Sequence, residues 1–182
     1  MIKKWKKVKT EETYRCGKWY RVDKDKVITP GGKEGIYYVI RKTPSVIIIP
    51  VDKKGDIYLT KQHRYPIGEY LLEFPAGHSD GEKKSLQCAK KELEEEMGLI
   101  SKKWQYLGYF YESLGMSNIM IYTYVAKEVT KKEDSAKDPL DKNLHETNIV
   151  SIRKLKELIG KNKIKDGLTL AAFIMASEKG IL

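Results

Sequence analysis

Residues 77–99 read GHSDGEKKSLQCAKKELEEEMGL, and they are the most informative segment of the sequence. Its second half has the period of an amphipathic helix, which we expect to run from Ser85 to Met97. Gly98 follows directly and suits a helix C-terminus. The apolar stripe that would face the core consists of Leu86, Ala89, Leu93 and Met97.

Another face of the same helix carries three carboxylates, Glu92, Glu95 and Glu96, at spacing i, i+3, i+4. Oxygen-only ligand sets suit hard divalent ions, so this spacing predicts a Mg²⁺ cofactor, with Mn²⁺ as the alternative. Such ions neutralise phosphate charge and activate water. The competing interpretation is a solvated acidic face, in which Lys90 and Lys91 pair with the glutamates four residues further on.

The segments around this helix predict an α+β protein with a mixed β-sheet. Residues 46–51 are continuously apolar, which is typical of a strand buried on both faces. Further strands are expected at 35–40, 57–60, 104–111 and 119–126, with two short ones around Cys16 and Gly17. Helices are expected at 152–159 and 168–177, and the polar residues 127–143 predict a long loop.

The acidic helix and the turn before it resemble the signature of the Nudix hydrolases. That signature is Gly, five residues, Glu, seven residues, then Arg-Glu-apolar-any-Glu-Glu-any-Gly-apolar. Two positions depart from it, because Lys91 stands where the family has Arg and Lys83 where it has the first Glu. The resemblance implies the Nudix fold, a mixed sheet in an α/β/α sandwich. The matching positions are Gly77, Glu92, Leu93, Glu95, Glu96, Gly98 and Leu99.

The flanking sequence is similar to the ADP-ribose pyrophosphatase branch of that family. QHRYP at 62–66 and LEFPAG at 72–77 match the strand and Pro-Ala-Gly turn of the branch, and IKDGLTL at 164–170 resembles the start of its final helix. The resemblance implies hydrolysis of ADP-ribose to AMP and ribose 5-phosphate. SLGMSN at 113–118 lacks the Ser-Pro-Gly turn and the following Glu of the branch. GDP-mannose or another sugar nucleotide is therefore the alternative substrate.

The resemblance also assigns roles within the site. The expected metal ligands are Glu92, Glu95 and Glu96, with the backbone carbonyl of Ala76 as a further oxygen. Glu95 is also assigned to catalysis, and Lys91 would orient one of the metal-binding carboxylates.

Relatives often take a general base from a loop far beyond the signature, and here Glu146 is the best match. Three residues are expected to bind substrate: Arg64 at the diphosphate, Glu73 near the metal cluster or a ribose, and Glu112 near the cleft. The alternatives to Glu146 are Glu133, Asp134, Asp138 and Asp141.

Residues 1–45 are expected to form an N-terminal antiparallel β arm used in dimerisation, and residues 46–182 the hydrolase domain. Members of the branch are usually homodimers whose N-terminal strands contribute to the site of the partner, so we expect a homodimer. Trp19, Tyr20 and Tyr37 are candidates to stack on the nucleobase, with a core or interface role as the alternative for each.

The charge balance is basic, with 35 Lys and Arg against 25 Asp and Glu and a net charge of +10. Such a surplus favours anionic partners, so a non-catalytic Nudix-fold RNA-binding protein is the competing hypothesis. The three signature carboxylates favour the enzyme. With only Cys16 and Cys88, far apart, we expect no disulfide and a cytoplasmic protein. No apolar run approaches the ~20 residues of a membrane-spanning helix, so neither a membrane segment nor a secretion signal is expected.

Overall fold

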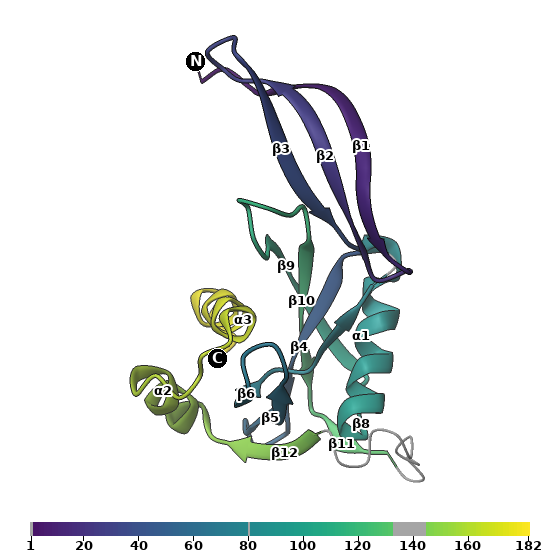
Figure 1. The fold of residues 1–182 in the computed structure, drawn as a ribbon. Helices are drawn as coiled ribbons and strands as arrows, with labels where there is room; N and C mark the ends of the chain where they lie inside the picture. Colours follow the sequence, from purple (N-terminus) through teal and green to yellow (C-terminus); the bar gives the residue numbers. More distant parts are fainter. Residues whose placement is uncertain (1, 80, 133–144) are drawn as a thin grey trace. The chain divides into compact units, whose positions relative to one another are not determined.

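The computed structural model describes residues 2–79, 81–132 and 145–182. The chain divides into two compact units. The first comprises residues up to Pro44 together with Tyr111–Met120, and the second comprises Ser45–Phe110 and Ile121–Leu182. Figure 1 labels the helices and strands of both units.

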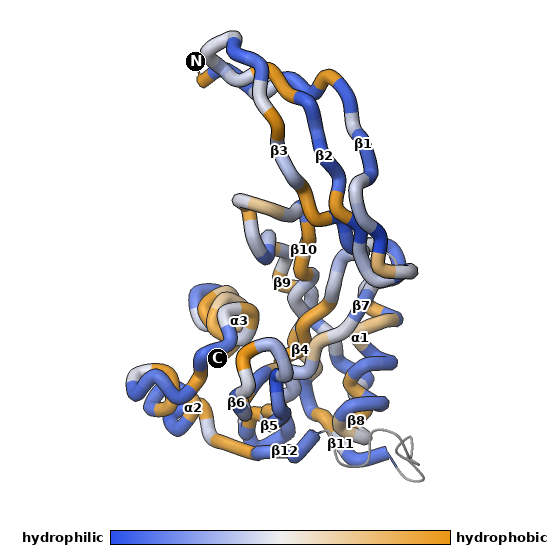
Figure 2. The backbone as a smooth tube through the Cα atoms, in the orientation of Figure 1, coloured by the Kyte–Doolittle hydropathy of each residue, from blue (hydrophilic) through white to orange (hydrophobic). Residues whose placement is uncertain are grey.

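The first unit is a three-stranded antiparallel sheet of β1 (Lys6–Cys16), β2 (Tyr20–Ile28) and β3 (Glu34–Arg41), in that order. The strands are longer than the two short ones predicted here. Charged and polar residues fill β1 and most of them face solvent, so the sequence lacks the apolar alternation that would mark its length. Figure 2 shows this hydrophilic character along β1 and β2.

The second unit contains a mixed seven-stranded sheet, which confirms the predicted α+β class. Its strand order is β12-β5-β4-β10-β9, with β6 paired to β5 and β7 paired to β4. Strands β4 and β10 run parallel, whereas β4 pairs antiparallel with β5 and β7. The strands are β4 (Ser45–Val51), β5 (Ile57–Arg64), β6 (Glu69–Glu73), β7 (Ala76–His78), β9 (Lys103–Tyr111), β10 (Met120–Lys127) and β12 (His145–Val150).

Strand β4 is the centre of the core, since the side chains of residues 46–49 are completely buried, as predicted. Helices α1 (Glu82–Met97) and α3 (Gly167–Glu178) both pack on β4 and lie on either side of it (Figure 1). Helix α2 (Ile152–Gly160) precedes α3. Figure 2 shows the hydrophobic residues gathered along β4, β10 and α3. The α/β/α arrangement of the Nudix fold is thereby confirmed.

Helix α1 begins three residues before the predicted start and ends as expected, with Gly98 in the left-handed conformation at φ 63°. Its buried stripe runs through Ser85, Ala89, Leu93 and Met97, so the expectation that Leu86 belongs to the stripe was wrong. Ser85 is tolerated in the core because its hydroxyl lies 2.7 Å from the hydroxyl of Tyr124 and 2.6 Å from the carbonyl of Glu82.

Two further expectations concern the polar segment and the membrane. Part of the predicted long loop is strand β11 (Thr130–Lys131), which pairs with β8 (Leu99–Ile100), and residues 133–144 lie outside the described part of the chain. Among the residues that the structure describes, no helix combines the length and apolar character needed to cross a membrane.

Candidate active site

The turn between β6 and β7 brings the signature glycine against the acidic helix. The pairing of β6 ends at Glu73, and Pro75, which has no N–H to donate, follows in the turn. The carbonyl of Pro75 accepts a hydrogen bond from the N–H of Ile48 at 3.0 Å, and β7 then pairs with β4 through Ala76 and Gly77. The turn is therefore attached to the buried central strand, which fixes the backbone in front of α1.

Gly77 lies against the carboxylate of Glu92. A Cβ built at position 77 would be 2.0 Å from Cδ of Glu92 and 2.2 and 2.4 Å from its two oxygens. Contacts this short do not occur between real atoms, so only glycine fits here while Glu92 keeps its position. The conformation of Glu92 thus depends on the missing side chain at position 77.

Glu96 is the most strongly perturbed acid of the site. Burial, followed by the charge of Glu92, raises its pKa to about 8, although an N–H of Ala76 and the charge of Arg64 act in the opposite direction. Burial and the charge of Glu95 also raise the pKa of Glu92. The Oε2 atom of Glu96 is buried and accepts no hydrogen bond from the described residues. These carboxylates repel one another in a poorly hydrated place.

The third signature carboxylate is in a different environment. The side chain of Glu95 is 52% exposed and forms an ion pair of 3.5 Å with Lys91. This pairing is the one that the solvated-face interpretation predicted for Lys91. The expectation that Lys91 orients one of the metal-binding carboxylates stays a prediction.

Within the described residues, no three His, Cys, Asp or Glu side chains are gathered in the arrangement of a formed metal site. Two observations nevertheless fit a divalent cation at Glu92 and Glu96. A buried carboxylate oxygen without a partner is costly unless a donor or cation reaches it. The glycine beside Glu92 leaves the backbone of the turn open to that carboxylate, and carboxylate oxygens are the ligands that Mg²⁺ prefers.

Arg64 forms an ion pair with the buried carboxylate of Glu73 next to these carboxylates. Nε of Arg64 donates to both oxygens of Glu73 at 3.0 Å, and Nη2 bonds to Oε2 as well. Gln62 donates to the same carboxylate at 3.2 Å. Glu73 is 3% exposed and Arg64 is 45% exposed. The guanidinium is therefore oriented from within the protein and open to solvent on its other side.

The other predicted residues have contacts of their own. Glu146 lies on β12 opposite Lys61 of β5, pairs with it at 3.5 Å and is 67% exposed. Glu112 belongs to the first unit, where its N–H donates to the carbonyl of Ile119. The four alternative bases lie in residues 133–144, outside the described part of the chain.

Residues that the sequence did not single out also contribute. Gln62 holds Glu73, and Thr60 and Thr169 bond to the turn between β6 and β7. The spacing of Asp166 and Thr169 in the sequence is typical of a helix N-cap, and it predicts the start of α3. It does not indicate that the side chain of Thr169 contacts the turn after β6.

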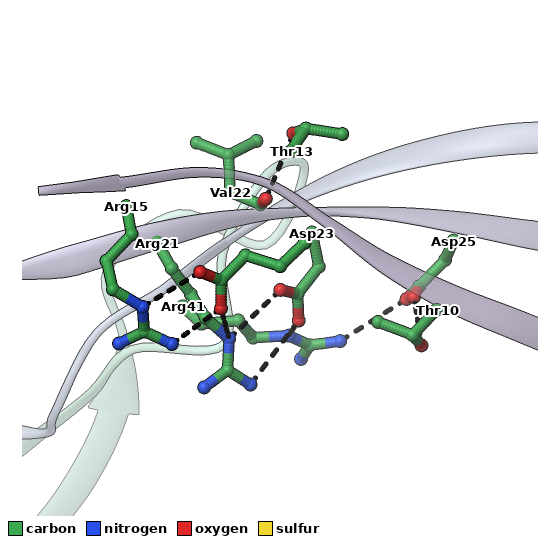
Figure 3. A network of polar contacts seen from close by, with 9 residues as sticks. Thr10, Thr13, Arg15, Arg21, Val22, Asp23, Asp25 and Arg41 are labelled. Carbon is green, nitrogen blue, oxygen red and sulfur yellow. Dashed lines mark hydrogen bonds and ion pairs between the residues drawn. The ribbon is translucent and has the colours of Figure 1, made fainter.

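The first unit contains a cationic pocket of its own. Its cavity is about 360 Å³, and its lining includes five positively charged side chains and no acidic one among the described residues. The sheet beneath holds Asp23, which bonds to Arg21 at 2.9 Å and to Arg41 at 3.2 Å, and Asp25, which bonds to Arg41 at 3.3 Å (Figure 3). The lining residues are Arg15, Lys18, Trp19, Tyr20, Arg21, Arg41, Lys42, Thr43 and Asn118.

Comparison with known proteins agrees with this geometry. The NUDIX domain matches residues 41–172, and the nucleoside diphosphate sugar hydrolase N-terminal domain matches residues 5–40. The chain therefore belongs to the Nudix family, and the prediction of a Nudix pyrophosphatase of the ADP-ribose pyrophosphatase-like branch is confirmed at that level.

Individual relatives cover most of the chain. The methanol dehydrogenase activator of Bacillus methanolicus is 28% identical over 92% of this chain and 89% of its own length. The ADP-ribose pyrophosphatase of Bacillus subtilis (strain 168) is 28% identical over 79% of this chain and 77% of its own. A solved structure, that of an ADP compounds hydrolase, superimposes with a TM-score of 0.83 over 100% of this chain and 99% of that one, at 16% identity. This last likeness establishes the fold.

Proposed function

We propose that the protein is a Mg²⁺-dependent pyrophosphatase that hydrolyses ADP-ribose to AMP and ribose 5-phosphate. The observation that carries the proposal is the half-buried pair of Glu92 and Glu96, with one buried oxygen of Glu96 left without a partner among the described residues and an oriented arginine beside it. Two anionic groups in such a place repel a substrate phosphate unless a cation joins them. The name of the Bacillus subtilis relative supports the choice of substrate.

Glu92, Glu95, Glu96 and the carbonyl of Ala76 would hold the metal, and Mn²⁺ is the alternative ion. When bound, such an ion offsets the charge of the diphosphate and makes water a better nucleophile. Glu95 would approach the ion from the surface, and Lys91 would keep its carboxylate oriented toward the site.

The diphosphate would be bound by Arg64. Its bonds to Glu73 use Nε and Nη2, so Nη1 is not engaged in them and can donate to a phosphate oxygen. Glu73 thereby fixes the plane of the guanidinium. We assign Glu146 as the general base that accepts a proton from the attacking water. Its side chain is exposed, so it can break the ion pair with Lys61 and turn toward the substrate.

The cationic pocket of the first unit combines five positively charged side chains with the exposed ring of Trp19, and three of these cations are paired with Glu12, Asp23 or Asp25. Such a pocket suits an anionic ligand that carries an aromatic ring. The β arm also exposes Trp5, Tyr14 and Tyr38, which fits its use in a homodimer. We therefore propose a homodimer, with the hydrolase domain at residues 46–182.

The proposal is tested by measuring phosphate release, coupled to a phosphatase, from a panel of nucleotides with Mg²⁺, with Mn²⁺ and with chelator. The panel contains ADP-ribose, GDP-mannose, other nucleoside diphosphate sugars, NADH and capped RNA. Metal-dependent cleavage of ADP-ribose that is lost in Glu92→Gln supports the proposal. Faster cleavage of GDP-mannose than of ADP-ribose would identify GDP-mannose as the preferred substrate. No turnover, together with RNA binding that survives Glu92→Gln, would identify a binding protein instead.

The role of Glu146 has a separate test. Glu146→Gln should lower kcat by about 100-fold, the usual effect of removing a general base, with little change in KM. Lys61→Met is the matched control, because it removes the ion-pair partner of Glu146 and keeps the carboxylate. Equal activity of Glu146→Gln and the wild type would assign the base to another residue.

A further inference from the structure

Two buried threonines hold one peptide bond of the turn between β6 and β7. The carbonyl of Glu73 accepts a hydrogen bond from the hydroxyl of Thr60 at 3.3 Å. The N–H of Phe74, on the other side of the same peptide, donates to the hydroxyl oxygen of Thr169 at 2.9 Å. Both threonines are completely buried, so water does not compete for these bonds. The plane of this peptide is therefore set by β5 on one side and by α3 on the other.

Asp166 orients the hydroxyl of Thr169. The hydroxyl donates its proton to Oδ2 of Asp166 at 2.6 Å, and the backbone N–H of Thr169 donates to the same oxygen at 2.8 Å. Because the proton is directed to the carboxylate, a lone pair of the hydroxyl remains for the N–H of Phe74. A helix N-cap needs only the backbone bond. The hydroxyl adds a connection from the cap of α3 to the turn.

The peptide held in this way connects the two halves of the active site. On its N-terminal side, the carboxylate of Glu73 accepts a hydrogen bond from Arg64. On its C-terminal side, Gly77 lies against the carboxylate of Glu92, and the backbone of Ala76 lies beside the carboxylate of Glu96. A rotation of the peptide would displace the arginine and the carboxylates relative to each other.

We propose that Thr169, oriented by Asp166, is a positioning residue for the hydrolytic site. It holds the turn so that the guanidinium of Arg64 and the carboxylates of Glu92 and Glu96 act on one diphosphate. The inference rests on the proposed function for its catalytic consequence. Its consequence for metal binding does not depend on any particular substrate.

The test compares Thr169→Val, which keeps the shape of the side chain and removes both bonds, with Thr169→Ser, which keeps them. Thr123→Val is the matched control, because Thr123 is equally buried and its hydroxyl only approaches the sulfur of Met175 at 3.8 Å. Asp166→Ser is a second variant that retains a capping hydroxyl but is too short to reach the side chain of Thr169. If Thr169→Val does not fold, the comparison of Asp166→Ser with the wild type tests the positioning role of Thr169.

The measurements are Mn²⁺ binding followed by electron paramagnetic resonance, kcat and KM for ADP-ribose, and the melting temperature. Thr169→Val and Asp166→Ser should bind Mn²⁺ about tenfold more weakly and lose about tenfold in kcat, as is usual for residues that support a metal ligand. Thr169→Ser should restore both values, and Thr123→Val should leave them unchanged.

Two outcomes would overturn the inference. One is a Thr169→Val protein that melts earlier but, while still folded, binds Mn²⁺ and turns over like the wild type. The other is a wild type that binds no Mn²⁺. A wild type that binds Mn²⁺ and cleaves no nucleotide refutes only the proposed function, since the difference between Thr169→Val and Thr169→Ser in Mn²⁺ binding still tests positioning.

Discussion

Replacing Gly77 by alanine should separate catalysis from stability. The new Cβ would lie 2.0 Å from Cδ of Glu92, whereas two carbon atoms in contact lie about 3.5 Å apart. The carboxylate must therefore retreat by about 1.5 Å. Glu92 can do so by rotating its side chain, because the clashing atoms are at the end of a flexible chain. The expected result is a displaced ligand in an otherwise intact fold.

The magnitudes follow from this geometry. A misplacement of about 1 Å in a positioning group can cost about 100-fold in rate, so kcat/KM for ADP-ribose should fall by about 100-fold, or roughly 2.7 kcal/mol. The free energy of unfolding should fall by only about 1 kcal/mol, the cost of a strained rotamer at Glu92. Mn²⁺ binding should weaken together with the rate.

The assay combines coupled phosphate release with urea unfolding followed by circular dichroism. Gly160→Ala is the control, because a Cβ there meets nothing within 4 Å, and it should leave kcat/KM unchanged. Activity of Gly77→Ala within threefold of the wild type would refute the reasoning. A loss of more than about 3 kcal/mol in the free energy of unfolding would also refute it, because the backbone rather than Glu92 would then have yielded.

The remaining predictions concern two acids, the half-buried Glu96 and the buried Asp23. Because its folded pKa of about 8 exceeds the ordinary value of 4.5, ionised Glu96 destabilises the metal-free fold, so stability should fall as pH rises from 4.5 to 8, by at most about 1.4 kcal/mol per unit. Glu96→Gln should abolish hydrolysis. Above pH 8 and without metal, its free energy of unfolding should exceed that of the wild type. The same dependence of the free energy of unfolding on pH in both proteins, between pH 4.5 and 8, would contradict this. Asp23→Asn should cost about 2 kcal/mol at pH 7, because it weakens the bonds of a buried carboxylate to Arg21 and Arg41. The pKa of Asp23 is held below its ordinary value of 3.8, chiefly by the hydrogen bond from Arg21. The stability that ionised Asp23 contributes is therefore fully present above pH 3.8, and it is lost as the pH falls through the lower pKa of the folded state. Thermal unfolding between pH 2.5 and 7 would show the two proteins converging at acid pH, and a constant difference would contradict the assignment.

Much of the second unit follows from local patterns in the sequence. The apolar run of β4 and the period of α1 identify these elements because burial acts directly on neighbouring residues. The exception in α1 is instructive. Ser85 takes a core position because the hydroxyl of Tyr124, far along the chain, satisfies it, and no pattern within the helix contains that information.

The first unit was harder to predict. Its strands are solvated over most of their length, so the alternation that indicates a strand is missing from β1. What stabilises the sheet is a buried carboxylate on β2 bonded to Arg41 of β3 (Figure 3). Such a bond joins residues 18 positions apart, and a charged residue in the sequence gives no sign of whether it is buried.

The connections of the active site extend further along the chain. Phe74 and Thr169 are 95 positions apart, and the sequence marks Thr169 only as part of a helix start. Glycine at position 77 is visible in the sequence, but its reason is the carboxylate that lies against it. The motif therefore indicates which residues to consider for the site, and the tertiary structure shows what each of them contacts.

The acidic helix has features of both interpretations of its glutamates, a solvated face and a metal site. Its outward glutamates behave as a solvated face, because Glu94 pairs with Lys132 at 2.5 Å and Glu95 pairs with Lys91. Its inward glutamates, Glu92 and Glu96, are partly withdrawn from water, and burial raises the pKa of both. A helix that only needed to be soluble would gain nothing from burying two like charges together. The division of one acidic run into ion-paired members and members whose pKa is raised by burial is thus the strongest structural argument for our proposal that Glu92 and Glu96 bind a cation.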